Sequence, residues 1–155
     1  TRKESSAASD VYKRQMQCSV EWNGPEGMLF VCQTGSGHTL TVDGPPEGGG
    51  NNLAPRPMET LLSGAGACSA YDVVMILQRS RKDIRRCRLN ITSERAETDP
   101  KVFTKIHFEF IVSGRDLQDK VVERAINLSH EKYCSAVAML NKTAEITHSY
   151  RIEEV

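Results

Sequence analysis

Residues 57–80 read PMETLLSGAGACSAYDVVMILQRS, and this stretch decides the fold. Its apolar residues recur at the spacing of a helix, and Pro57 and Glu59 favour a helix amino terminus. The apolar positions cover more than one face, so we expect a long buried central helix. Gly64 and Gly66 each cost about 1 kcal/mol inside a helix relative to alanine, and close approach of another backbone is the expected reason for them. A symmetric dimer would cover the faces that one small sheet leaves open.

Segments on both sides of this helix alternate apolar and polar residues, as strands do. The expected strands are residues 16–22, 28–33, 38–43, 86–94, 102–113 and 144–152. The first three should form an antiparallel meander, and the Gly-, Pro- and Asn-rich residues 44–56 a flexible surface loop. Asp116 and Ser135 are expected to cap two further helices. Because strands are grouped rather than alternating with helices, the class is α+β with a mainly antiparallel sheet.

The composition describes one globular domain. Of 155 residues, 39% are hydrophobic and 26% charged, which is enough for one core. We assign the domain to residues 16–155 and treat residues 1–15, which lack a useful period, as a disordered or artefactual leader. Twenty basic and twenty acidic residues cancel, which argues against a nucleic-acid partner or an anionic membrane surface.

Other patterns bear on compartment and cofactors. We find no apolar run of about 20 residues and no charged-then-apolar signal, so a cytoplasmic location is the default expectation. Five cysteines are an odd number without the spacing of a disulfide framework, which argues against a disulfide scaffold, and no Cys-x-x-Cys motif occurs. The four histidines are scattered, so no metal site is expected.

Cys68 and Cys134 are the candidate site residues, because each lies among small or apolar residues in a predicted helix. Two thiols that meet can act as a nucleophile and its resolving partner, whereas a lone buried cysteine is more often a small apolar core residue. A nucleophilic cysteine acts as a thiolate. Asp72, one helical turn beyond Cys68, would oppose thiolate formation unless it is itself paired. An activating cation is then required, and Arg56 is the candidate.

Glu59 precedes Cys68 by nine residues. On a straight helix that is about 13 Å of rise and roughly the opposite face, so Glu59 could reach only the thiol of a partner subunit. His130, near Cys134, either lowers a thiol pKa or is an exposed helical histidine, and the second interpretation is favoured. The remaining cysteines and histidines are expected to have structural roles. His107 should face solvent, and the others should belong to the core: Cys18, Cys32, Cys87, His38 and His148.

The predicted helix resembles the central helix of the OsmC/Ohr family in the motif Pro57-x-Glu59-x-Leu61-Leu62-x-Gly64-Ala65-Gly66-Ala67-Cys68, followed by Ser69-Ala70-Tyr71-Asp72. Other segments agree in identity, order and spacing: Gly37-His38, Asp43-Gly44, Thr92-Ser93-Glu94-Arg95, Gly114-Arg115-Asp116-Leu117, Glu131-Lys132-Tyr133-Cys134-Ser135 and Ile146-Thr147-His148-Ser149-Tyr150. The resemblance covers residues 16–155 and is to the YhfA-like branch of that family.

The resemblance implies an OsmC-like intertwined homodimer with active sites at the subunit interface, each around the two cysteines. By analogy with the peroxidase branches, Cys68 attacks the distal oxygen of an organic hydroperoxide, releases an alcohol and becomes a sulfenic acid. Cys134 then condenses with it to a disulfide, which an external dithiol reduces. No metal, flavin or other cofactor is implied.

The sequence departs from the hydroperoxide-resistance pattern at two places. Met58 stands where that branch has a glutamate, and Glu59 follows one residue later. That branch also carries an activating arginine in its early strands, whereas residues 16–52 contain no arginine. A cation for Cys68 must therefore come from another part of the chain.

Three hypotheses about function follow. The leading one is a thiol-dependent peroxidase, an oxidoreductase of oxidative stress that acts through Cys68 and Cys134. The alternative is a non-peroxidatic, stress-associated dimer that binds a small apolar or thiol-reactive ligand in the same interface pocket. The third, a purely structural dimer with buried cysteines, leaves the paired motifs unexplained.

Overall fold

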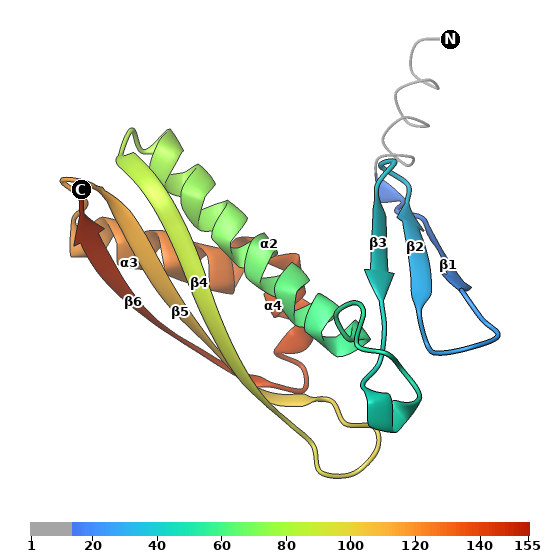
Figure 1. Cartoon of the computed structure of the whole chain (residues 1–155). Helices are drawn as coiled ribbons and strands as arrows, with labels where there is room; N and C mark the ends of the chain where they lie inside the picture. Colours follow the sequence, from blue (N-terminus) through green and yellow to red (C-terminus); the bar gives the residue numbers. More distant parts are fainter. Residues whose placement is uncertain (1–13) are drawn as a thin grey trace, which may run out of the picture. The chain divides into compact units, whose positions relative to one another are not determined.

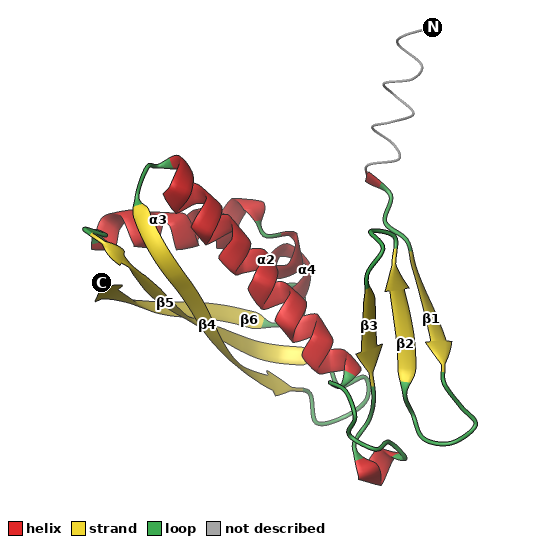
Figure 2. Ribbon diagram, turned by 45° about the horizontal axis from the view of Figure 1, so that its top comes forward, coloured by secondary structure: helices red, strands yellow, loops and turns green. Residues whose placement is uncertain are grey.

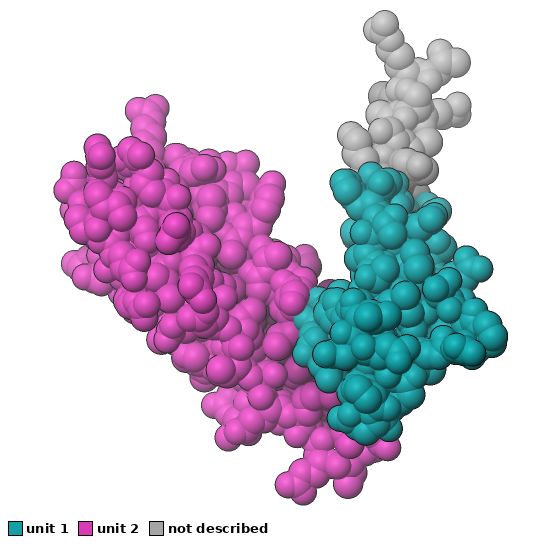
Figure 3. All heavy atoms as spheres, viewed as in Figure 1, with its two compact units in different colours: residues 1–60 teal, residues 61–155 magenta. Residues whose placement is uncertain are grey.

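The computed structural model describes residues 14–155, so most of the expected leader lies outside the described residues. The chain divides into two compact units, residues 1–60 and 61–155, which Figure 3 colours separately. The single domain expected over residues 16–155 stays a prediction.

The first unit contains an antiparallel meander, as the alternating pattern predicts. Its strands are β1 (Cys18–Trp22), β2 (Phe30–Thr34) and β3 (Thr39–Val42), in the order β1-β2-β3 (Figure 2). All five residues of β1 are exposed in the single chain. The assignment of Cys18 to a core is therefore wrong for the single chain, and Cys32 on β2 is only half-buried. His38 is likewise exposed, and its Nδ1 hydrogen-bonds the Ser36 hydroxyl at 3.1 Å.

The loop after β3 is anchored by hydrogen bonds to Asp43, and the flexibility expected of it stays a prediction. Asp43 is 2% exposed. Its carboxylate accepts the backbone N–H groups of Leu53 at 3.0 Å, Gly44 at 2.7 Å and Asn51 at 3.3 Å, which together lower its pKa. A short 3-10 helix, η1 (Pro46–Gly48), follows. A β-carbon on Gly50 would collide with the Gly44 carbonyl, so only glycine allows this close approach.

The second unit contains a sheet of order β4-β5-β6, formed by β4 (Asp83–Arg95), β5 (Phe103–Arg115) and β6 (Glu145–Glu154). The β4–β5 pair is antiparallel, as expected, but β6 pairs with β5 in parallel. Parallel neighbours need a long crossover. Here the crossover consists of α3 (Asp119–Leu128), the π-helix η2 (Ser129–Tyr133) and α4 (Ser135–Leu140).

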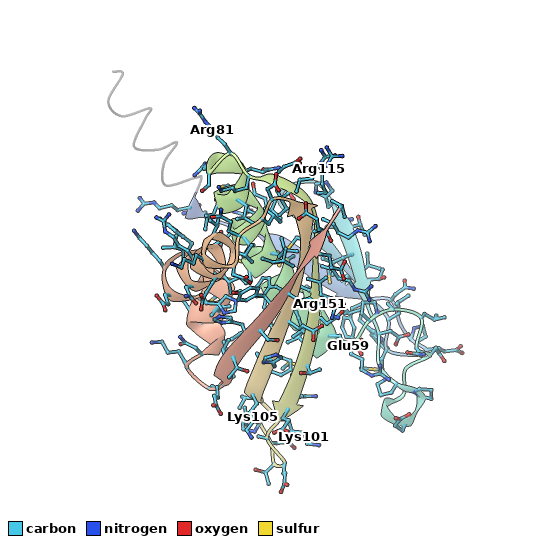
Figure 4. All side chains as sticks on the ribbon, turned by 90° about the vertical axis from the view of Figure 1, so that its left-hand side faces the viewer. Glu59, Arg81, Lys101, Lys105, Arg115 and Arg151 are labelled. Atoms are coloured by element: carbon cyan, nitrogen blue, oxygen red, sulfur yellow. The ribbon has the colours of Figure 1, made fainter. Side chains whose placement is uncertain are left out.

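The helices of this unit lie along one face of its sheet (Figure 1). The β5 residues on that face are fully or almost fully buried: Ile106, Phe108, Phe110 and Val112. Charged residues occupy the other face, among them Lys105 and Arg151, which Figure 4 labels. Lys105 pairs with Glu94 at 3.8 Å, and Arg151 pairs with Glu153 at 3.4 Å. The alternation in the sequence therefore predicts correctly which residues of β5 form the core.

The predicted central helix is α2 (Pro57–Arg79), most of which belongs to the second unit. Its buried residues form one face: Ala65, Gly66, Ser69, Asp72, Val73 and Leu77. A β-carbon on Gly66 would collide with the Ile91 side chain, whereas one on Gly64 would have nothing within 4 Å. The expected close backbone is therefore absent in the single chain. Tyr71 is 71% exposed, so complete burial of α2 stays a prediction tied to the dimer.

Within residues 14–155, α2 is the one helix whose length and mean hydropathy of 1.5 would allow it to cross a membrane. Core helices of soluble proteins often share these properties. The buried polar residues Ser69 and Asp72 of α2 hydrogen-bond to η2. These contacts identify α2 as part of the folded unit.

Candidate functional site: the Cys68–Cys134 thiol pair

Cys68 and Cys134 come together in the second unit from elements far apart in sequence. Cys68 lies half-buried on α2, and Cys134, only 3% exposed, lies between η2 and α4. Cys68 lies close enough to Cys134 to help raise the pKa of the Cys134 thiol, and both residues are free cysteines. A nucleophile–resolving pair requires this proximity.

Cys134 is the cap of α4, a place the sequence assigned to Ser135. Its Sγ accepts the backbone N–H of Val137 at 3.4 Å, and Ser135 is instead the first residue of the helix. Asp116 is likewise not a cap, because α3 starts after Gln118. Both predictions placed the cap one or two residues from the observed helix boundary, because residue types that favour caps also occur beside the true cap and sequence locates a helix end only to this precision.

Burial raises the pKa of Cys134 to about 11, and the neighbouring Cys68 adds to the rise through its hydrogen bond and charge. The N–H of Val137 acts in the opposite direction. Cys134 therefore holds its proton at neutral pH. A protonated thiol is a hydrogen-bond donor, and its neighbour here is the Cys68 sulfur.

Asp72 is paired, as the sequence required, but with a hydroxyl and not with a cation. It is 9% exposed, and its Oδ2 accepts the Ser129 hydroxyl at 3.0 Å. Ser129 also lies 3.2 Å from the Ser69 carbonyl oxygen. The Ser69 hydroxyl and His130 Nε2 form a hydrogen bond of 2.7 Å. We call these four residues, Ser69, Asp72, Ser129 and His130, the α2–η2 polar cluster.

His130 is half-buried against the sheet, so the favoured interpretation of an exposed histidine is wrong. Its ring meets those of Phe108 at 5.0 Å and His148 at 5.3 Å, measured between centroids. Burial, and then the charge of His148, lowers the pKa of His130 to about 4. His130 is therefore neutral at physiological pH and does not supply the cation that a thiolate would need.

We expect His130 to destabilise the protein in mild acid. Its pKa falls from 6.5 to about 4 on folding, so the unfolded chain binds the proton more readily. The free energy of unfolding is therefore unaffected by protonation of His130 above pH 6.5 and decreases as the pH falls from 6.5 toward 4. We expect a total decrease of about 2 kcal/mol, allowing for the partial exposure of the ring. Urea unfolding of wild type and His130→Asn across this range measures the effect. Equal pH dependence in both proteins would contradict it.

Arg56 and Glu59 are paired with each other. The Arg56 guanidinium lies 3.4 Å from Glu59 Oε1, and its backbone N–H donates to Oε2 at 3.0 Å. The two side chains are 42% and 54% exposed, and both belong to the first unit. Their roles toward the thiols stay predictions.

The other candidates lie outside the thiol pair. Cys87, on β4, is half-buried, and burial raises its pKa. His148 is also half-buried, and His107 hydrogen-bonds the hydroxyls of Thr147 at 2.7 Å and Ser149 at 2.9 Å. Among residues 14–155, no group of three His, Cys, Asp or Glu side chains could hold a metal.

Sequence reasoning missed Ser69 and Ser129. A signal existed for Ser69, because Ser69 and Asp72 are three residues apart on the face that also carries Ala65 and Val73. Polar residues on an apolar helix face must find hydrogen-bond partners when buried. Ser129, 60 residues away, could not be identified as that partner without the fold.

The comparisons agree with this architecture. A sequence model described as OsmC-like protein matches residues 48–149, and the chain belongs to this family. The chain is 49% identical over 137 residues to protein YhfA of Escherichia coli strain K12, a match that covers 88% of this chain and 98% of YhfA.

Solved structures share the fold. A hypothetical protein from Aquifex aeolicus VF5 superposes with a TM-score of 0.79 at 25% identity, covering 92% of this chain and 98% of the other. An organic hydroperoxide resistance protein OsmC from Legionella pneumophila superposes with a TM-score of 0.64 at 16% identity, covering 88% and 96%. The second likeness concerns the fold alone.

Proposed function

We propose that the protein is a thiol-dependent peroxidase that reduces organic hydroperoxides. The observation that carries the proposal is the proximity of Cys68 to Cys134, two cysteines far apart in sequence, of which Cys68 helps to raise the pKa of Cys134. The proposal is also supported by the family: the chain belongs to the OsmC-like proteins, and an organic hydroperoxide resistance protein shares their fold.

In the proposed reaction, the Cys68 sulfur attacks the distal peroxide oxygen. The O–O bond breaks, the released oxygen takes a proton to give an alcohol, and Cys68 becomes a sulfenic acid. Cys134 then condenses with it, so that an S–S bond forms, the S–O bond breaks and water leaves. An external dithiol reduces the disulfide by exchange and is oxidised itself. None of these three steps requires a metal or flavin.

The working form we propose is a cytoplasmic homodimer. Exposed apolar side chains in each unit support the binding of a second copy of this chain. They are Val20 and Trp22 in the first unit, and Leu61 and Tyr71 in the second. Such surfaces mark interaction sites when they are contiguous. In the dimer, Arg56 and Glu59 are the proposed groups that orient the hydroperoxide or stabilise the Cys68 thiolate.

Loss of cumene hydroperoxide in the presence of a dithiol tests this function. We expect wild type to consume peroxide catalytically and Cys68→Ser to fall to the rate of buffer, because the attacking sulfur is gone. Cys87→Ser, which changes another half-buried cysteine of the same unit, should keep the wild-type rate. A wild-type protein that consumes no peroxide, or a Cys68→Ser variant that still does, would contradict the proposal.

A hollow beside α2 favours the second candidate, binding of a small apolar or thiol-reactive ligand. It has a volume of about 420 Å³ and is lined mainly by apolar residues: Leu62, Ser63, Gly66, Ala67, Ala70, Leu89 and Ile91. If this is the function, Cys68 should be alkylated slowly by iodoacetamide while no hydroperoxide is turned over.

A further inference from the structure

We propose that Ser129 is a positioning residue, which acts through the α2–η2 polar cluster to hold the Cys134 thiol beside Cys68 for disulfide formation. This inference rests on the proposed function, because it concerns the second step of that reaction. Ser129 touches neither sulfur in the contacts described above. Its effect passes through the backbone of the turn that ends at Cys134.

The backbone connection is a π-helical turn. The N–H of Cys134 donates to the Ser129 carbonyl at 2.7 Å, five residues back. This turn is one residue wider than an α-helical turn, and such turns are rare and often occur at functional sites. Because one strong hydrogen bond joins the two residues, displacement of Ser129 displaces Cys134.

The side-chain connection runs to the helix that carries Cys68. Ser129 Oγ donates to Asp72 Oδ2 at 3.0 Å, and its other neighbour is the Ser69 carbonyl at 3.2 Å. Ser69 and Ser129 are both fully buried. Since Ser69 follows Cys68 directly and Asp72 lies one turn further on the same helix, Ser129 is anchored to the backbone that positions the Cys68 sulfur.

Donors and acceptors can be assigned to every hydrogen bond of the α2–η2 polar cluster without conflict. The Asp72 carboxylate only accepts, so it takes the Ser129 proton. Ser69 lies between Ser129 Oγ at 3.4 Å and His130 Nε2 at 2.7 Å, and a hydroxyl can donate to one and accept from the other. In the described residues no buried side-chain N or O atom lacks a partner. Removal of one hydroxyl therefore leaves a buried acceptor unsatisfied and loosens the anchor.

The two reaction steps should respond differently to this loosening. Attack on the peroxide uses the Cys68 sulfur, which lies within the continuous helix α2 and is positioned mainly by that helix. Disulfide formation instead requires the two α-carbons within about 4.4–6.8 Å. In that step the S–O bond of the sulfenic acid breaks and an S–S bond forms. The Cys134 proton leaves with the hydroxyl group as water.

The test measures both steps in Ser129→Ala. Sulfenic acid formation with cumene hydroperoxide is followed by mass after dimedone trapping, and disulfide formation by the loss of free thiols. We expect disulfide formation to slow about tenfold to a hundredfold, since small misplacements have such effects on intramolecular reactions. The first step should stay within about twofold of wild type, and the dimedone adduct should accumulate.

Two further variants control for folding. Ser69→Ala removes the hydroxyl that bonds His130, and alanine is a good helix former, so the same selective slowing is expected if Ser129→Ala does not fold. Ser135→Ala removes an exposed hydroxyl next to Cys134 and should leave both rates unchanged. Equal slowing of both steps, or no slowing in a folded Ser129→Ala or Ser69→Ala, would overturn the inference.

Oxidation by diamide separates this inference from the proposed function. Diamide takes two hydrogens from a neighbouring thiol pair, is reduced to a hydrazine, and leaves a disulfide without any peroxide. If wild type fails to react with hydroperoxide, the proposed function fails. Slower Cys68–Cys134 disulfide formation by diamide in Ser129→Ala than in Ser135→Ala would still support the positioning role, and equal rates would refute it.

Discussion

Replacement of Cys134 by serine is expected to slow catalysis sharply after the first turnover. The variant retains Cys68, so hydroperoxide should still convert this residue to a sulfenic acid. Without the neighbouring thiol, reduction depends on collision with the external dithiol, and we expect turnover to fall at least about a hundredfold because an effectively intramolecular reaction becomes bimolecular. Peroxide loss under steady-state conditions, together with dimedone trapping, measures both effects.

Cys32→Ser is the matched control for this prediction. It also removes a half-buried thiol, but from β2 of the first unit. It should keep turnover and give no persistent dimedone adduct. Sustained wild-type turnover in Cys134→Ser would contradict the resolving role, and a faster reaction of Cys134 than of Cys68 with peroxide would reverse the assignment of the two sulfurs.

Truncation of Phe108 is expected to have the largest effect on stability. Its side chain is fully buried on β5, and its ring contacts that of His130. Phe108→Ala removes this apolar surface and leaves a cavity, and such changes cost about 3–5 kcal/mol. Urea denaturation should show a lower midpoint with a similar slope. Loss of the ring that supports His130 should also loosen the α2–η2 polar cluster.

Met139→Ala provides the comparison for Phe108→Ala. Met139 is 69% exposed on α4, and substitutions at such surface positions usually change stability by less than about 0.5 kcal/mol. Similar losses of stability in the two variants would contradict the view that the buried face of β5 is the core of the second unit.

Much of the fold was accessible from the sequence because its signals are local. The pattern of residues 57–80 predicts α2 (Pro57–Arg79) nearly to the residue. The alternation of Ile106, Phe108 and Phe110 with Lys105, His107 and Glu109 identifies the buried face of β5. Apolar periodicity is the direct consequence of burying one face of an element, which makes these predictions robust.

Non-local features were not accessible. The direction of β6 relative to β5 depends on a crossover of three helical elements, and no residue of β6 signals it by itself. The hydrogen bonds of Asp43 also anchor a loop whose composition gives no sign of them. In both cases the deciding partners are set by the path of the chain.

For the candidate site, too, some features could be predicted from the sequence and others could not. The pairing of Cys68 with Cys134 followed from a family resemblance and not from spacing. The need to pair Asp72 followed from electrostatics, but its partner Ser129 did not. His130 was misassigned because its burial depends on Phe108 and His148, which belong to other elements.

The central claim is that hydroperoxide links the sulfurs of Cys68 and Cys134, and mass spectrometry tests it most directly. Reduced protein is treated with one equivalent of cumene hydroperoxide, alkylated and digested without reductant. We predict a cross-linked peptide that contains both residues and is two hydrogens lighter than the sum of its parts. Recovery of Cys134 as an alkylated free thiol, with Cys68 unmodified or joined to a different cysteine, would contradict the account.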